Sequence, residues 1–135
     1  MKICEPQPED WPGIRDLTAS FNLDYDGMEE DRFWIAREGE LVAGTVGLKR
    51  HSDCLELVSL SVDPAFRARG LGRLLVEALM SAASGDVYLA TVIPNYFRQC
   101  GFAPSDRVPA GMVKPPGWCD GCPKDHCTVL VRTAR

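Results

Sequence analysis

Three arginines and two glycines are interleaved in the segment FRARGLGR, which spans residues 66–73. The arginines supply positive charge, and a glycine lets a ligand approach the backbone where a Cβ atom would collide with it. An apolar helical pattern begins in the same stretch, and the free N–H groups of a first helical turn favour an anion. We therefore predict a phosphate or pyrophosphate site made of Arg67, Ala68, Arg69, Gly70, Leu71, Gly72 and Arg73. The alternative is a surface turn with solvated arginines.

Two other phosphate-binding loops do not match this segment. A Walker loop requires a lysine followed by serine or threonine after its glycines, and no such pair follows Gly72. A dinucleotide fingerprint requires a third glycine, at a position where this chain has Leu75.

The predicted elements on either side of the loop are a strand and a helix. Residues 55–63 are of strand type, and Pro64 ends that strand because it cannot donate to a ladder. After the loop, an apolar stripe at helical spacing contains Leu71, Leu74, Leu75, Ala78, Leu79 and Ala82. A strand at 87–91 follows, so the two strands should be parallel with a right-handed crossover.

The remaining pattern predicts an α+β domain with a mixed sheet. Strands are expected at residues 1–6, 32–38, 41–49, 55–63, 87–91, 101–105 and 127–133, and helices at 9–21, 71–82 and 94–100. Gly101 is a natural stop for the last of these helices.

With these motifs in place, the chain resembles the GNAT acetyltransferases. The run LELVSLSVDPAFRARGLGRLLVEAL, residues 55–79, is similar to the coenzyme A (CoA) motif of that family, R/Q-x-x-G-x-G/A after a strand. NYFRQCGF, residues 95–102, is similar to the short helix that ends in Gly-Phe. The resemblance covers roughly residues 30–103. It implies a mostly antiparallel sheet with a central, splayed parallel strand pair flanked by helices.

The resemblance also implies where acetyl-CoA would bind. The strand segment Leu60, Ser61 and Val62 would hold the pantetheine arm through its backbone, and residues 67–73 would cradle the pyrophosphate. The ends of strands 55–63 and 87–91 would diverge, leaving backbone groups that a pantetheine amide can satisfy like an added strand.

Two residues are candidates for acid–base chemistry. Glu56 lies in an otherwise apolar strand, where burial would raise its pKa, and some relatives carry a catalytic glutamate at the matching place. The alternative is a strand-edge glutamate that faces water. Relatives often have a tyrosine hydroxyl near the thiol, but this chain has Phe97 at that position and Tyr96 before it. Tyr96 is therefore a weak candidate for the general acid, and Phe97 is expected to contact CoA.

The cysteines allow several interpretations. Cys100 shares a helix face with Tyr96, and a packed core cysteine is favoured there over a covalent nucleophile. The Cys-rich segment at 115–127 contains Cys119, Cys122, His126 and Cys127, which could bind zinc, form a disulfide or remain free thiols. Some short acetyltransferases similar to the amino-acid N-acetyltransferase branch also carry cysteines in this tail, which favours a small amino-acid-like acceptor.

Composition sets the remaining expectations. A chain of 135 residues fits one domain, residues 1–135. Its net charge of -4 argues against a nucleic-acid surface, and no stretch approaches the roughly 20 apolar residues of a membrane helix. The N-terminus lacks the apolar core of a signal peptide, so we expect a cytoplasmic protein, with a homodimer left open.

Together these features predict an acetyl-CoA-dependent N-acetyltransferase that acts on a small-molecule amine by direct attack in a ternary complex. The runner-up is a catalytically weak CoA-binding or thiol/metal sensor module. The phenylalanine at the usual tyrosine position and the cysteine tail motivate that alternative.

Overall fold

The computed structural model describes residues 1–113 and 127–133, and these form two compact units. The first unit contains residues 1–49 and 57–82, and the second contains residues 50–56 and the described part of 83–135. Strand β4 (Leu55–Val62) contributes its first two residues to the second unit and its remainder to the first.

The strands follow the predicted α+β order. In the first unit, β1 (Lys2–Cys4), β2 (Arg32–Glu38), β3 (Leu41–Arg50) and β4 are hydrogen-bonded in that sequence. In the second unit, the order continues from β4 to β5 (Val87–Thr91), β7 (Thr128–Arg132) and β6 (Ala103–Pro104). The resulting seven-stranded sheet is mostly antiparallel and contains one parallel pair, β4 with β5, as predicted.

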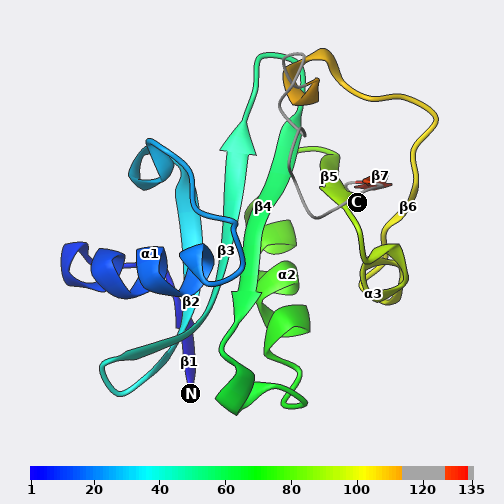
Figure 1. Ribbon diagram of the computed structural model, residues 1–135. Helices are drawn as coiled ribbons and strands as arrows, with labels where there is room; N and C mark the ends of the chain where they lie inside the picture. Colours follow the sequence, from blue (N-terminus) through cyan, green and yellow to red (C-terminus); the bar gives the residue numbers. More distant parts are fainter. Residues whose placement is uncertain (114–126, 134–135) are drawn as a thin grey trace. The chain divides into compact units, whose positions relative to one another are not determined.

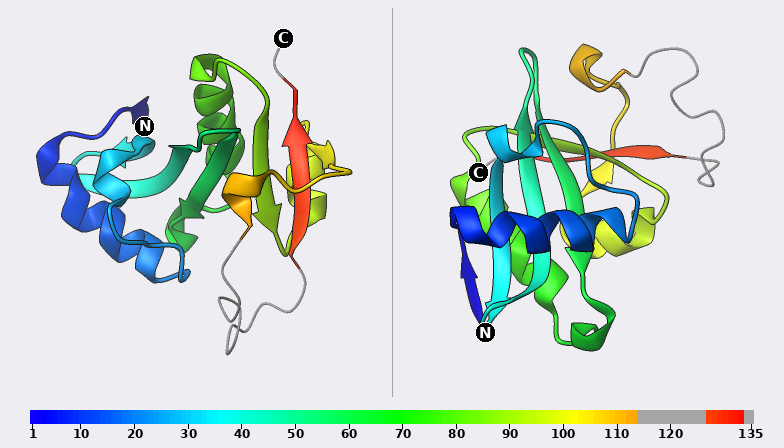
Figure 2. Two further views of the ribbon diagram at one scale, coloured as in Figure 1. Left: turned by 90° about the horizontal axis from the view of Figure 1, so that it is seen from above. Right: turned by 60° about the vertical axis from the view of Figure 1, so that its left-hand side comes forward.

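One face of the sheet in the first unit packs against helix α1 (Trp11–Ala19), which runs across it in Figure 2. Alternate residues of β2 point to this face because side chains of a strand alternate. Phe33 and Ile35 thereby meet Ile14 of the helix, in a buried cluster completed by Met28 and Val42. Trp11 adds an edge-to-face contact with Phe33, with ring centroids 5.3 Å apart.

The other face of the first unit carries helix α2 (Leu71–Ala82), labelled behind β4 in Figure 1. A Cβ atom on Gly44 of β3 would lie 2.9 Å from Leu75 Cδ1, so the absence of a side chain there makes room for the helix. The buried helix residues are Leu71, Gly72, Leu75, Val76 and Leu79. Leu74, predicted to belong to the apolar stripe, is instead 52% exposed. It precedes Leu75 by one residue, about 100° of helix rotation, and so leaves the packed face.

The second unit is built around β5. β5 pairs in parallel with β4 at only two positions, Leu55↔Val87 and Glu56↔Tyr88, and in antiparallel fashion with β7 over its whole length. Helix α3 (Pro94–Gln99) follows, and the chain turns at Gly101 with a left-handed φ of +90°. Phe97 of this helix packs edge-to-face on Phe102, with a centroid distance of 6.0 Å.

Short single-turn helices complete the described chain, namely η1 (Pro8–Asp10), η2 (Met28–Glu30), η3 (Pro64–Phe66) and η4 (Ala110–Met112). None of the helices in the described part of the chain has the length and hydropathy that a membrane crossing requires.

A glycine in β3 provides a test of the first unit's packing. A Cβ on Gly47 would lie 2.6 Å from Cζ of Phe33, whose ring is 1% exposed and cannot swing aside. We expect Gly47→Ala to lower the free energy of unfolding by about 1–3 kcal/mol, as overpacking of a close-packed core does. Urea denaturation measures this change.

The matched control is Gly85→Ala, because a Cβ there would meet nothing within 4 Å. That variant should keep or slightly raise the free energy of unfolding, by less than about 1 kcal/mol. Equal losses in the two variants would contradict the packing argument.

Candidate functional site

The predicted anion loop is exposed and has an unusual backbone. Residues 67–70 are all solvent-exposed, and both Ala68 (φ +67°) and Gly70 (φ +72°) are left-handed. The N–H of Leu74 donates to the carbonyl of Gly70 at 3.1 Å, which makes it the first backbone bond of α2. Because the first N–H groups of an α-helix have no acceptors inside the helix, the start of α2 is a favourable place for an anion.

Two of the loop's arginines lie over aromatic rings of the first unit. The Arg67 guanidinium is 5.6 Å from the centroid of Phe21, and that of Arg69 is 5.0 Å from Phe66. Stacking uses the face of a guanidinium, whereas its N–H donors lie in its plane and remain able to bind an oxyanion.

The strand before the loop is irregular where the pantetheine arm was predicted to bind. Ser59 adopts a left-handed φ of +56°, and its side chain donates to the carbonyl of Leu23 at 2.6 Å. Its own carbonyl accepts a hydrogen bond from Thr45 Oγ1 at 2.8 Å. Among the described residues, Ser61 Oγ is the buried side-chain oxygen that has no hydrogen-bond partner. A buried hydroxyl without a partner is costly, and a ligand amide would satisfy it.

In the second unit, Glu56 is buried and paired. Its Oε1 lies 2.7 Å from Nε2 of His51, and the two side chains are 8% and 14% exposed. The expectation of a water-facing strand-edge glutamate is therefore wrong, because the turn before β4 folds His51 back over the carboxylate. His51 was not predicted from sequence as a site residue. The available signal was a histidine five residues before a strand glutamate, across a tight turn.

Three contacts hold the turn that carries His51. The N–H of His51 donates to the carbonyl of Cys54 at 2.9 Å, which closes the turn between β3 and β4. The Asp53 carboxylate accepts the N–H of Gly111 at 3.2 Å (Oδ1) and 3.4 Å (Oδ2). A Cβ on Gly111 would lie 2.6 Å from Cβ and 2.7 Å from Cγ of His51, so this backbone packs directly on the histidine.

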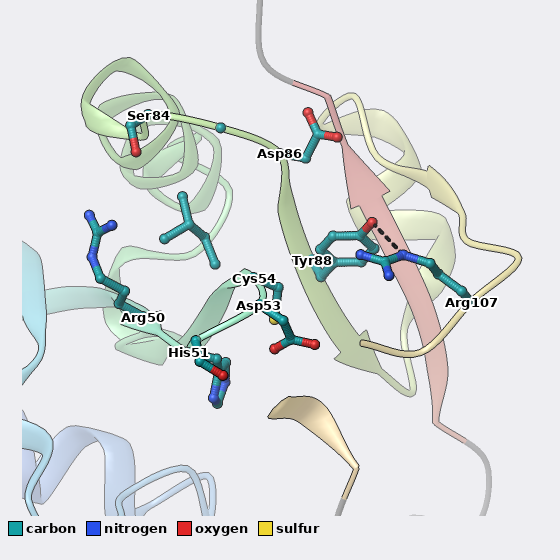
Figure 3. A pocket seen from close by; sticks show the side chains of 11 residues that line it. Arg50, His51, Asp53, Cys54, Ser84, Asp86, Tyr88 and Arg107 are labelled. Carbon is teal, nitrogen blue, oxygen red and sulfur yellow. Dashed lines mark hydrogen bonds between the residues drawn. The ribbon is translucent and has the colours of Figure 1, made fainter. Parts of the chain in front are cut away.

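A pocket of about 500 Å³ opens beside this turn, entirely within the second unit. Figure 3 shows His51, Asp53 and Cys54 from the turn, Tyr88 from β5 and Arg107 from the segment after β6. Arg107 Nε donates to the Tyr88 hydroxyl at 3.2 Å. The complete lining is Arg50, His51, Ser52, Asp53, Cys54, Leu55, Ser84, Gly85, Asp86, Tyr88 and Arg107. Charges of both signs thus surround one cavity.

Cys54 in this pocket is held as a neutral thiol. Burial, and then the nearby negative charges of Asp53 and Glu56, raise its pKa to about 11. A thiolate is therefore scarce near neutral pH, and Cys54 is a poor nucleophile there.

The other predicted residues of the second unit pack together. Phe97 is buried and meets Tyr96 edge-to-face at 5.2 Å, while Tyr96 is 37% exposed. Cys100 is 4% exposed, and its carbonyl accepts a hydrogen bond from Arg132 at 3.0 Å. This agrees with a packed core cysteine. The roles of Tyr96 as acid and Phe97 as CoA contact stay predictions.

The zinc hypothesis falls largely outside the described residues. Cys119, Cys122 and His126 lie in the segment that the structure does not describe, and Cys127 is an exposed free thiol. Within residues 1–113 and 127–133, no three potential ligands are grouped closely enough to hold a metal ion.

The predicted site residues are thus divided between the two units. The loop 67–73 and the strand segment 60–62 belong to the first unit, whereas Glu56, Tyr96 and Phe97 belong to the second.

Comparison with known proteins identifies the fold family. A family model of the acetyltransferase (GNAT) family matches residues 2–102. Rv2747 from Mycobacterium tuberculosis, solved in complex with CoA and NLQ, superposes with a TM-score of 0.79 at 19% identity, covering 100% of both chains. A GNAT-family acetyltransferase from Staphylococcus aureus Mu50 gives 0.78 at 18% identity, covering 99% of both chains.

N-acetylglutamate synthase from Neisseria gonorrhoeae, complexed with CoA and N-acetyl-glutamate, gives a TM-score of 0.81 at 18% identity. The match covers 99% of this chain and 35% of the synthase chain. These structures share the fold, and the family match extends over most of the sequence. The chain belongs to the acetyltransferase (GNAT) family.

Proposed function

We propose that this acetyl-CoA-dependent acetyltransferase transfers the acetyl group to the primary amine of a small amino-acid-like acceptor, by direct attack in a ternary complex. The observation that carries the proposal is the loop 67–73, whose exposed arginines and left-handed Gly70 lead into the first turn of α2. A pyrophosphate is the ligand that this combination of positive charge, a helix N-terminus and an open backbone suits best.

The donor side of the proposal continues along β4. The pantetheine arm would run beside Leu60, Ser61 and Val62, and the unpartnered Ser61 hydroxyl supports a polar ligand group there. A strand N–H in this segment would polarise the acetyl carbonyl, as an oxyanion hole does. Tyr96 is the proposed proton donor to the departing thiolate.

The acceptor side requires a neutral amine, because an ammonium group has no lone pair with which to attack. Glu56, buried and hydrogen-bonded to His51, supports a proton-accepting role on this side of the reaction. The adjacent pocket has Arg50 and Arg107 for a carboxylate and Asp53 and Asp86 for an ammonium group, which supports an amino-acid-like acceptor. The N-acetyl-glutamate bound by the gonococcal synthase is consistent with that class.

Gly70→Asp tests the donor site. The substitution places a carboxylate at the proposed pyrophosphate position, and a like charge there costs several kcal/mol. We expect CoA affinity, measured by isothermal titration calorimetry, to fall about 100-fold or more. Gly70→Asn, which tolerates a left-handed backbone and carries no charge, should lose less.

Gly39→Asp is the matched control. Gly39 also has a positive φ, +60°, and a Cβ at either glycine would meet nothing within 4 Å. Both aspartates therefore carry a similar backbone strain of about 1–2 kcal/mol, but Gly39 lies in the β2–β3 hairpin. Equal CoA affinities for the two variants would remove the phosphate-loop assignment.

A panel of amines tests the acceptor class and the enzyme itself. We expect CoA release, followed with a thiol reagent, to be fastest with free amino acids and slower with uncharged alkylamines or polyamines of similar size. Faster turnover of the amines that lack a carboxylate would contradict the amino-acid-like acceptor. Tight CoA binding without turnover on any amine would favour the sensor alternative.

A further inference from the structure

We propose that His51 is the proton-accepting residue of this acetyltransferase, and that Glu56 is a positioning residue that orients and polarises its imidazole. The inference rests on the proposed function. It reassigns the base from the strand carboxylate to the histidine that covers it.

Access to the pair favours the histidine. Glu56 is the more buried partner, and it is not among the residues that line the pocket, whereas His51 is. One carboxylate oxygen is already hydrogen-bonded to the imidazole. An amine bound in the pocket can therefore reach His51, whereas Glu56 lies behind it.

The hydrogen bond to Glu56 also determines which ring nitrogen of His51 can accept a proton. An ionised carboxylate only accepts hydrogen bonds, so Nε2 of a neutral His51 carries the hydrogen that Glu56 accepts at 2.7 Å. Nδ1 then holds the lone pair. This is the arrangement in which a carboxylate fixes the tautomer of an imidazole base.

Residues from several elements surround the His51–Glu56 pair and supply charges of both signs. Glu56 approaches from β4, Asp53 and Cys54 from the turn, Arg50 from the end of β3, and Arg107 across the pocket. The Cys54 thiol is neutral, so the nearby anions are the two carboxylates. The two guanidinium groups supply the positive charges.

The proton balance of the proposed step is simple. The acceptor R–NH3⁺ gives one proton to Nδ1, directly or through one water molecule, and the imidazolium that forms is paired with the Glu56 carboxylate. The free amine attacks the thioester carbon, the C–N bond forms, and the C–S bond breaks. Tyr96 gives its proton to the departing thiolate, and the second amine proton restores the Tyr96 hydroxyl. His51 then releases its Nδ1 proton to water in the pocket and is ready for another turnover.

The pH dependence of kcat/KM distinguishes the two assignments. His51→Gln should lower kcat/KM by on the order of 10²–10⁴-fold and remove the acidic limb of the profile. Glu56→Gln should also slow the reaction but keep an acidic limb, because the imidazole that accepts the proton is still present. Loss of the limb in Glu56→Gln and its retention in His51→Gln would overturn the proposal. So would an acidic limb unchanged in both variants.

Controls separate this role from folding and from the donor site. Glu40→Gln, an exposed amide substitution in the β2–β3 hairpin, should change neither the rate nor the limb. CoA affinity should stay the same in all these variants. If His51→Gln unfolds, His51→Ala with added imidazole provides the second test, since an external base should restore activity to a missing histidine and not to a missing carboxylate.

Ring-nitrogen NMR of the resting protein gives a readout that does not depend on turnover. The chain has only 2 histidines, so the His51 signal is assigned by its loss in His51→Gln. We expect the neutral form with hydrogen on Nε2, which donates to Glu56. Hydrogen on Nδ1 of the neutral ring would overturn the proposal. A wild-type protein inactive on every amine would instead refute the proposed function, whatever the tautomer.

Discussion

The parallel ladder between β4 and β5 has only two residue pairs, and the proposed chemistry depends on that shortness. β4 runs on to Val62 and β5 to Thr91, so backbone groups beyond the ladder must find other partners. The left-handed Ser59 interrupts strand alternation just after the last pair. The stretch that follows leads into the arginine–glycine loop, and the two paired residues lead back to His51. One strand thereby connects the proposed donor loop to the proposed proton acceptor.

Local features of the sequence predicted the fold well, and the exposed loop before α2 lies where they placed it. The residues 67–73 and the start of α2 are contiguous, so their geometry follows from glycine, proline and helical periodicity without long-range information. Leu71, Leu75 and Leu79 of the predicted stripe of α2 are buried, whereas Leu74 is exposed and Val76 is buried in its place, because periodicity gives the edge of a buried face only to within one residue. The short parallel ladder is invisible in the strand pattern itself.

The proposed acid–base site depends on tertiary contacts. The sequence pattern predicted these contacts less well than it predicted the fold. The burial of Glu56 is decided by a turn that brings His51 over it and by the backbone of Gly111 on the far side of that turn. Neither contact has a periodic signature. The pocket is likewise lined by Arg50, Asp86 and Arg107, which come from three separate parts of the chain. The cysteine tail, for which the sequence left three alternatives, lies outside the described residues.

Gly111 also determines when, as the chain folds, the surroundings of His51 are completed. It reaches back to Asp53 over 58 residues of chain, so the contact forms only when a loop of that length closes. During synthesis, His51 and Glu56 leave the ribosome well before Gly111, which packs against His51. The surroundings of the proposed acid–base pair are therefore complete only when the chain has returned to the turn that it made early on.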